Sequence, residues 1–164
     1  MKNKILIIST GGTFNKVYDP LSGELFIDKN SHALQNLAVS WRYELEILNT
    51  ISKDSLDINK EDRKSLVKTI KKSNYQKIII IHGTDTMDIT AKYLAKHIQN
   101  KQIILTGAMI PYSINRVEAT ANLASAYGYL LHLKANGVYI AMNGVIDEHH
   151  KVTKDRKYGK FTLK

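Results

Sequence analysis

Residues 78–86 read Ile78-Ile79-Ile80-Ile81-His82-Gly83-Thr84-Asp85-Thr86, and this stretch decides the fold. Four consecutive β-branched residues predict a strand buried on both faces, as in a parallel sheet covered by helices. The strand ends in a loop rich in glycine and hydroxyl groups. An apolar helical pattern over residues 91–98 follows it. The stretch therefore predicts one strand–loop–helix unit.

The same unit recurs along the chain. Further strands are expected at residues 4–9, 43–48, 102–105 and 138–142, and helices at residues 31–39, 59–70 and 118–134. Asp19 to Gly23 predicts the turn of a hairpin. The alternation predicts a doubly wound α/β fold of Rossmann-like or flavodoxin-like type, in three layers. We expect a mostly parallel sheet, helices on both of its faces and a β-hairpin after the first strand. The polar stretch from Asp147 onward predicts no definite element.

Length and composition limit the class of protein. The 164 residues, 43% of them hydrophobic, fit a single domain over residues 1–164 with a buried core. The absence of cysteine excludes disulfides, thiolate metal sites and a cysteine nucleophile. The apolar run 5–8 is too short for a signal peptide, and no run is long enough to span a bilayer. These features favour a cytoplasmic protein.

The formal net charge of +9 comes mostly from lysines, which are densest in residues 151–164. Such a charge can indicate a nucleic-acid partner. The sequence has neither a basic-aromatic recognition motif nor a basic helical stripe, so a solvated, lysine-rich surface is the better interpretation. We therefore expect neither a nucleic-acid nor a membrane partner. Acidic metabolites can still be attracted by the long-range field.

Three apolar strands end in small polar loops, at residues 10–13, 83–86 and 106–108. Ligands of open parallel sheets bind at this carboxyl edge, where glycines let backbone N–H groups approach. The sequence contains neither a dinucleotide-binding glycine motif nor a P-loop, which weakens both of those interpretations. A threonine hydroxyl needs a nearby base to become nucleophilic. Asp85 could hold a lysine that acts on Thr84 as this base.

These loops resemble the signatures of the bacterial-type L-asparaginase family, whose nucleophile is a threonine. The resemblance rests on Thr10-Gly11-Gly12-Thr13-Phe14, His82-Gly83-Thr84-Asp85-Thr86-Met87, Thr106-Gly107-Ala108-Met109-Ile110-Pro111, Arg116-Val117-Glu118 with Asn122-Leu123, and residues 138–143 with Val152-Thr153-Lys154. The matches follow the family's order and spacing over nearly the whole chain. Glu118 stands where the family usually has Asp.

The resemblance implies the roles of individual residues. Thr13 would attack the side-chain amide, and Thr84, Asp85 and Lys154 would form a cluster that polarises groups and transfers protons. Gly12, Gly83 and Ala108 would line the substrate site, where backbone N–H groups stabilise the oxyanion. The family's mechanism implies an ester on threonine, and neither a metal nor an organic cofactor.

The resemblance implies two further roles, those of a tyrosine and a serine. Tyr18 is the only tyrosine in residues 14–30, so it is our choice for the family's general-base tyrosine. Ser55, in a segment that resembles the family's Asp-Ser-x-Asp, is our choice for binding the substrate's α-carboxylate, with Ser52 as the competitor. Typical members carry a second, C-terminal domain, which we expect this chain to lack. We expect a homo-oligomer.

Two hypotheses about function follow. The chain is an L-asparaginase-like enzyme that hydrolyses asparagine to aspartate and ammonia, with glutamine or another side-chain amide as the alternative substrate. Otherwise it is a binding or regulatory module that keeps the site without turnover. Retention of Thr13, Thr84, Asp85 and Lys154 favours the enzyme.

Overall fold

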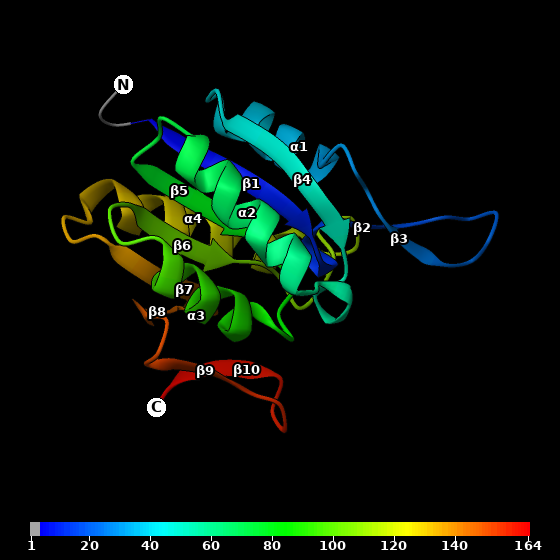
Figure 1. Cartoon of the computed structure of the whole chain (residues 1–164). Coiled ribbons are helices and arrows are strands. Elements are labelled where there is room, and N and C mark those ends of the chain that lie inside the picture. Colours follow the sequence, from blue (N-terminus) through cyan, green and yellow to red (C-terminus); the bar gives the residue numbers. More distant parts are fainter. Residues whose placement is uncertain (1–3) are drawn as a thin grey trace.

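The structure is a computed structural model that describes residues 4–164, with a six-stranded sheet at its centre (Figure 1). The strands lie in the order β4-β1-β5-β6-β7-β8. The first five are parallel, and β8 is antiparallel to β7. Their bounds are β1 Ile5–Gly11, β4 Glu46–Lys53, β5 Lys77–Ile81, β6 Gln102–Thr106, β7 Gly137–Met142 and β8 Val145–Glu148. The predicted α/β fold with a mostly parallel sheet is confirmed.

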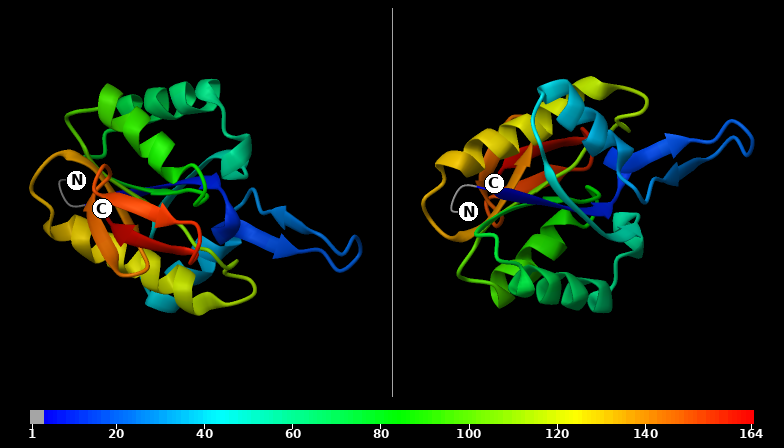
Figure 2. Two further views of the ribbon diagram at one scale, coloured as in Figure 1. Left: turned by 90° about the horizontal axis from the view of Figure 1, so that it is seen from below. Right: turned by 90° about the horizontal axis from the view of Figure 1, so that it is seen from above.

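Helices cover both faces of the sheet, as predicted. Helices α2 (Lys60–Lys72) and α3 (Met87–His97) lie on one face, and α1 (His32–Trp41) and α4 (Arg116–His132) lie on the other (Figure 2). The side chains of β5 alternate between the two faces. Ile78 and Ile80 pack under α2 and α3, while Ile79 and Ile81 pack under α1 and α4. All four isoleucines are fully buried, because the strand has helices on each side.

Two hairpins complete the fold. Strands β2 (Lys16–Tyr18) and β3 (Leu25–Ile27) form the predicted hairpin, which projects from the body of the molecule (Figure 1). Strands β9 (Val152–Asp155) and β10 (Lys160–Leu163) form a second hairpin, which the sequence pattern did not reveal. Val152 and Phe161 anchor this second hairpin in the core under α3. Two short 3-10 turns, η1 (Thr13–Asn15) and η2 (Ser55–Asp57), follow β1 and β4.

The start of α2 follows the predicted cap. The Asn59 side chain accepts from the backbone N–H groups of Glu61 and Asp62, and the Asp62 carboxylate accepts from the Asn59 N–H. This reciprocal pair satisfies N–H groups that the first turn of a helix leaves unpaired. Strand β4 begins and ends later than the predicted 43–48 range, because it pairs with β1 from Glu46 onward.

Two buried lysines tie the amino ends of the strands to helix ends. Lys77 Nζ donates to the carbonyl oxygens of Leu130 and Leu131, at 2.8 and 2.6 Å. Lys101 Nζ donates to those of Ser73 and Tyr75, at 2.9 and 2.7 Å. These carbonyls lie at or just beyond the ends of α4 and α2, where backbone acceptors lack helical partners and cations are favoured. Burial lowers the pKa of Lys101 below its ordinary value.

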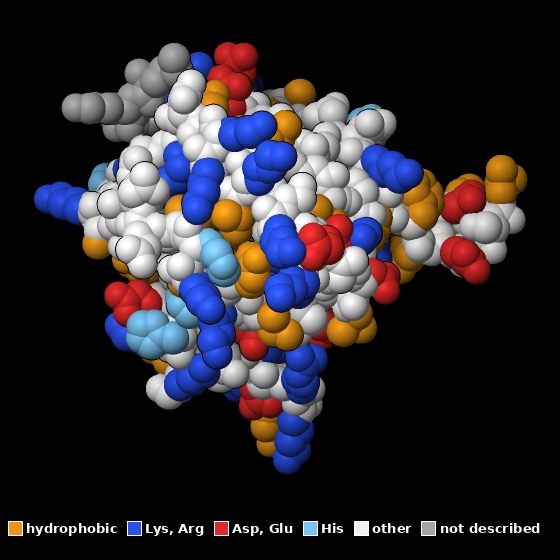
Figure 3. All heavy atoms as spheres, in the orientation of Figure 1, with side chains coloured by type: hydrophobic (Ala, Val, Ile, Leu, Met, Phe, Trp, Pro, Cys, Tyr) orange, Lys and Arg blue, Asp and Glu red, His pale blue; other side chains and the backbone are white. Residues whose placement is uncertain are grey.

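The surface over α2 is rich in exposed lysines (Figure 3). Those of α2 are Lys60, Lys64, Lys68, Lys71 and Lys72. Within residues 4–164, none of the helices has the length and apolarity that crossing a lipid bilayer would require.

We predict that Ile80→Ala lowers the free energy of unfolding by about 2–5 kcal/mol, because it leaves a cavity between β5 and the α2/α3 layer. Urea denaturation followed by circular dichroism measures this change. Ile89→Ala on α3 is the matched control, since Ile89 is 52% exposed. Its effect should stay within about 0.5 kcal/mol. Equal losses in the two variants would contradict the two-sided burial of β5.

Candidate active site

The threonine loops, residues 10–13 after β1 and 83–86 after β5, touch each other. Gly12 has φ = 74°, a left-handed conformation, and a Cβ atom built on it would lie 2.5 Å from the backbone nitrogen of Gly83. Only glycine fits such a backbone approach without strain. The structure therefore brings the two predicted loops together at the carboxyl edge of the sheet.

Lys154 reaches the second loop from β9. Its Nζ lies 2.8 Å from Thr84 Oγ1 and 2.7 Å from Asp85 Oδ1. The ammonium therefore donates to a hydroxyl and to a carboxylate at once. The β9–β10 hairpin carries Lys154 from a distant part of the sequence to the end of β5, so the predicted cluster of Thr84, Asp85 and Lys154 is assembled in the structure.

Asp85 is held by two cations. Arg156 Nη1 lies 3.2 Å from Asp85 Oδ1, and Arg156 Nη2 donates to the Asp85 carbonyl oxygen at 2.8 Å. The hydrogen bond from Lys154 and the charges of both cations hold the pKa of Asp85 below its usual range, against the opposing effect of partial burial. The carboxylate therefore stays ionised at neutral pH. The sequence analysis did not single out Arg156. Arg156 lies in the turn just after β9, so no strand pattern in the sequence places it beside Lys154.

Ser55 lies directly behind the second loop. Its side chain is 1% exposed, its Oγ accepts from the Asp85 N–H at 3.2 Å, and a Cβ atom on Gly83 would lie 2.8 Å from that Oγ. The Ser55 carbonyl accepts from the Thr86 hydroxyl at 2.7 Å. Ser52 instead lines a groove beside β3. Of the two serines considered, Ser55 is the one that contacts the loop.

Thr13 begins η1 and is half-buried. Within residues 4–164, its hydroxyl has no hydrogen-bond partner, and the N–H groups of Thr13 and Thr84 donate to no protein acceptor. The Gly12 N–H, in contrast, donates to the Lys53 carbonyl at 3.0 Å. The Gly83 N–H also donates to no protein acceptor in the described part of the chain, so the free N–H donors near the loop contact belong to Thr13, Gly83 and Thr84 rather than to Gly12.

Tyr18 and Ala108 occupy different surroundings. Tyr18 is 55% exposed on β2, and in the described part of the chain no hydrogen bond joins its side chain to the threonine loops. Ala108 is fully buried after β6. The carboxylate of Glu118 fixes the segment that follows Ala108, accepting from the N–H groups of Met109 and Ile110 at 3.0 Å.

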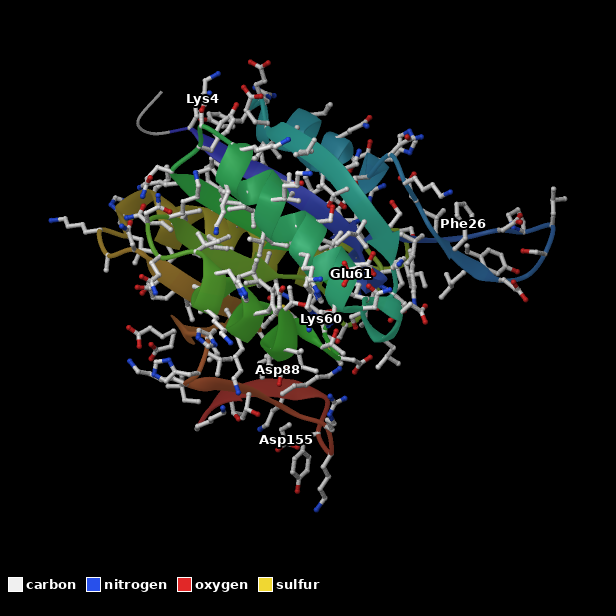
Figure 4. The ribbon with its side chains drawn as sticks, in the orientation of Figure 1. Lys4, Phe26, Lys60, Glu61, Asp88 and Asp155 are labelled. Carbon is white, nitrogen blue, oxygen red and sulfur yellow. The ribbon has the colours of Figure 1, made fainter. Side chains whose placement is uncertain are left out.

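A small cavity of about 100 Å³ opens beside Lys154. It is lined by Thr84, Asp85, Asp88, Ile140, Val152, Thr153, Lys154, Arg156 and Phe161. Figure 4 shows Asp88 of α3 next to the hairpin that carries Asp155. The walls thus combine carboxylates, cations and hydroxyls, a set that can move protons and bind a polar ligand.

His82 ends β5 and is 1% exposed. Its Nδ1 lies 2.8 Å from the Gly83 carbonyl, and its Nε2 is buried without a partner among the described residues. Burial is the main cause that lowers the pKa of His82 from 6.5 to about 4. The ring is therefore neutral and donates from Nδ1 to the loop.

Comparison with known proteins agrees with this α/β architecture. The family described as "Asparaginase, N-terminal" matches residues 4–160. L-asparaginase 1 of Escherichia coli K12 is 27% identical over 93% of this chain and 48% of its own length. A probable periplasmic L-asparaginase of Haemophilus influenzae is 31% identical over 92% of this chain and 46% of its own.

Solved structures agree with the sequences. The thermostable L-asparaginase of Thermococcus kodakarensis is 27% identical, with a TM-score of 0.84 over 98% of this chain and 51% of that protein. A probable cytoplasmic L-asparaginase of Campylobacter jejuni is 26% identical, with a TM-score of 0.80. The match covers 99% of this chain and 52% of that protein. The chain belongs to the asparaginase family. It spans about half the length of the relatives it matches.

We predict that stability falls as the pH falls from about 6.5 towards 4, because His82 titrates near 6.5 when unfolded and at about 4 when folded. In this window the unfolded chain binds more protons, so the free energy of unfolding rises with pH. Urea unfolding at pH 7 and pH 5 measures the difference. His82→Gln should reduce it, while His132→Gln, at an exposed position of α4, should leave it unchanged. An undiminished difference in His82→Gln would assign the effect to other groups.

Proposed function

We propose that this chain is an L-asparaginase-like amidohydrolase that hydrolyses L-asparagine to L-aspartate and ammonia. The observation that carries the proposal is the double contact of Lys154 Nζ with Thr84 Oγ1 and Asp85 Oδ1, in a loop that touches the loop bearing Thr13. Relatives named L-asparaginase support the same substrate class. No step requires a metal or an organic cofactor.

Thr13 is the nucleophile in this proposal. Its Oγ1 attacks the side-chain amide carbon, the hydroxyl proton is passed to the amide nitrogen, and the C–N bond breaks to release ammonia. The product is a β-aspartyl ester on Thr13. Water then adds to the ester carbon, one of its protons returns to Thr13, and aspartate leaves. The hydroxyl has no competing partner within residues 4–164, which leaves it free for this attack.

Lys154 and Thr84 form the proton relay. The Thr84 hydroxyl oxygen accepts from Lys154, so its own proton can point towards the reacting atoms. A proton can pass along the 2.8 Å contact between the two groups. The ionised carboxylate of Asp85 fixes the position of Lys154 and balances its charge. Tyr18 is the proposed additional relay, which requires the β2–β3 hairpin to fold over the loops.

Backbone and serine groups bind the substrate in this proposal. The free N–H groups of Thr13 and Thr84 stabilise the oxyanion, each contributing roughly 3–4 kcal/mol to the transition state. The Ser55 hydroxyl and the Asp85 N–H bind the substrate's α-carboxylate. Without substrate, this N–H donates to Ser55 Oγ. The close approach of Gly12 and Gly83 and the buried Ala108 shape the walls. For the compartment we propose the cytoplasm, in keeping with a sequence that lacks cysteine.

We predict that Thr13→Ala abolishes ammonia release from asparagine while the protein still binds aspartate, because the nucleophile is lost and the binding groups remain. Lys154→Met should lower kcat by about 10²–10⁴-fold through loss of the proton relay. A coupled ammonia assay with asparagine and with glutamine measures both. Thr120→Ala on α4 is the matched control and should keep full turnover. A folded wild type that binds asparagine and releases no ammonia would favour the regulatory-module hypothesis instead.

We also predict self-association. Leu21, Phe26 and Val117 are 96%, 51% and 76% exposed, and contact with a second copy would cover such apolar side chains. Light scattering at micromolar concentration should give a mass above that of one chain. A stable monomeric mass would contradict this prediction.

A further inference from the structure

A second hollow lies outside the candidate active site. It is a pocket of about 480 Å³ between the β2–β3 hairpin, the first turns of α1 and the segment that leads into α4. It is lined by Phe14, Asn15, Lys16, Val17, Phe26, Asp28, His32, Ala33, Asn36, Tyr112, Ser113 and Arg116. None of the residues assigned to catalysis or substrate binding is among them, and the volume suits a small organic molecule.

The walls of this pocket are largely apolar. Phe14 is fully buried and stacks on Tyr112, with ring centroids 6.3 Å apart and an interplanar angle of 13°. Val17 and Phe26 are opposite each other across the hairpin strands, and Phe26 remains 51% exposed (Figure 4). An apolar ligand body placed here would cover side chains that now face water, a favourable change.

Each charged side chain of the pocket except Arg116 has a hydrogen-bond partner among the described residues. Lys16 Nζ lies 2.6 Å from Asp54 Oδ2, and Asp28 accepts from the His32 backbone and contacts its ring at 2.9 Å. Arg116 lies over the ring of Tyr112, its Cζ 5.4 Å from the centroid. In the described chain its guanidinium has neither a carboxylate within 4.0 Å nor a hydrogen-bond partner. The pocket therefore offers an unpaired cation beside apolar walls.

We propose that this pocket is a second binding site, for a small organic monocarboxylate with an apolar body. A planar guanidinium binds a carboxylate through two parallel hydrogen bonds, and its stacking on Tyr112 orients it for that contact. The apolar body lies against Val17, Phe26 and Tyr112. Asparagine is a poor fit because it lacks an apolar body that would cover Val17, Phe26 and Tyr112.

The test uses the full chain and three matched probes in titration calorimetry. The first is 3-phenylpropionate, the second its neutral amide 3-phenylpropionamide, and the third is propionate, which lacks the ring. We expect saturable binding of 3-phenylpropionate and affinities at least about tenfold weaker for the other two, because each lacks one of the two contacts. Equal affinity of the acid and the amide, or no saturation by the acid, would overturn the proposal.

Variants then locate the bound probe. Arg116→Gln, at an exposed position, should weaken binding of 3-phenylpropionate at least about tenfold. Arg42→Asn removes the same charge at the exposed end of α1, where φ is 53° and asparagine is tolerated, and should leave binding unchanged. Lys154→Met should also leave binding unchanged. Loss of binding in Lys154→Met but not in Arg116→Gln would assign the probe to the threonine loops and overturn the proposal. Neither outcome depends on turnover of asparagine.

Discussion

Burial of β5 on both faces is the constraint on which the rest of the structure depends. Ile78 to Ile81 are all fully buried, so helices must lie on each side of the sheet. Helical crossovers in turn require neighbouring strands to run parallel, and parallel strands end at one edge. The polar loops after β1, β5 and β6 therefore meet at this edge. The position of the candidate active site follows from the hydrophobic pattern of the strands.

The sequence predicted a helix or strand best where a single local pattern determines where that element lies. The isoleucine run predicted β5, Asn59 with Asp62 predicted the start of α2, and residues 19–23 predicted the hairpin turn. It predicted the strands at the edge of the sheet and in the C-terminal hairpin least well. Strand β4 is an edge strand with half-buried side chains, so its pattern was too weak to set its limits. Strands β9 and β10 are short and mostly polar, and their pairing with each other, which is not visible in the local pattern, defines them.

For the candidate site, the resemblance to asparaginases identified residues and the structure shows how they are assembled. Thr84, Asp85 and Lys154 come together although Lys154 is about seventy positions away in the sequence. Two details depend on three-dimensional contacts that no local pattern encodes. Arg156 holds Asp85 from the same hairpin, and the Gly12 N–H is occupied by the Lys53 carbonyl. The roles of Tyr18 and Ser55 remain predictions.

The buried lysines at the opposite edge of the sheet have a consequence for chemical labelling. Lys77 and Lys101 are each 8% exposed, and their amines are hydrogen-bonded to backbone carbonyls. The lysines over α2 lie in solvent and can react at once with an acylating reagent. Lys77 and Lys101 can react only when the ends of α4 and α2 detach from the sheet. Their rate of modification would therefore report opening of this edge, with the surface lysines of the same molecule as an internal standard.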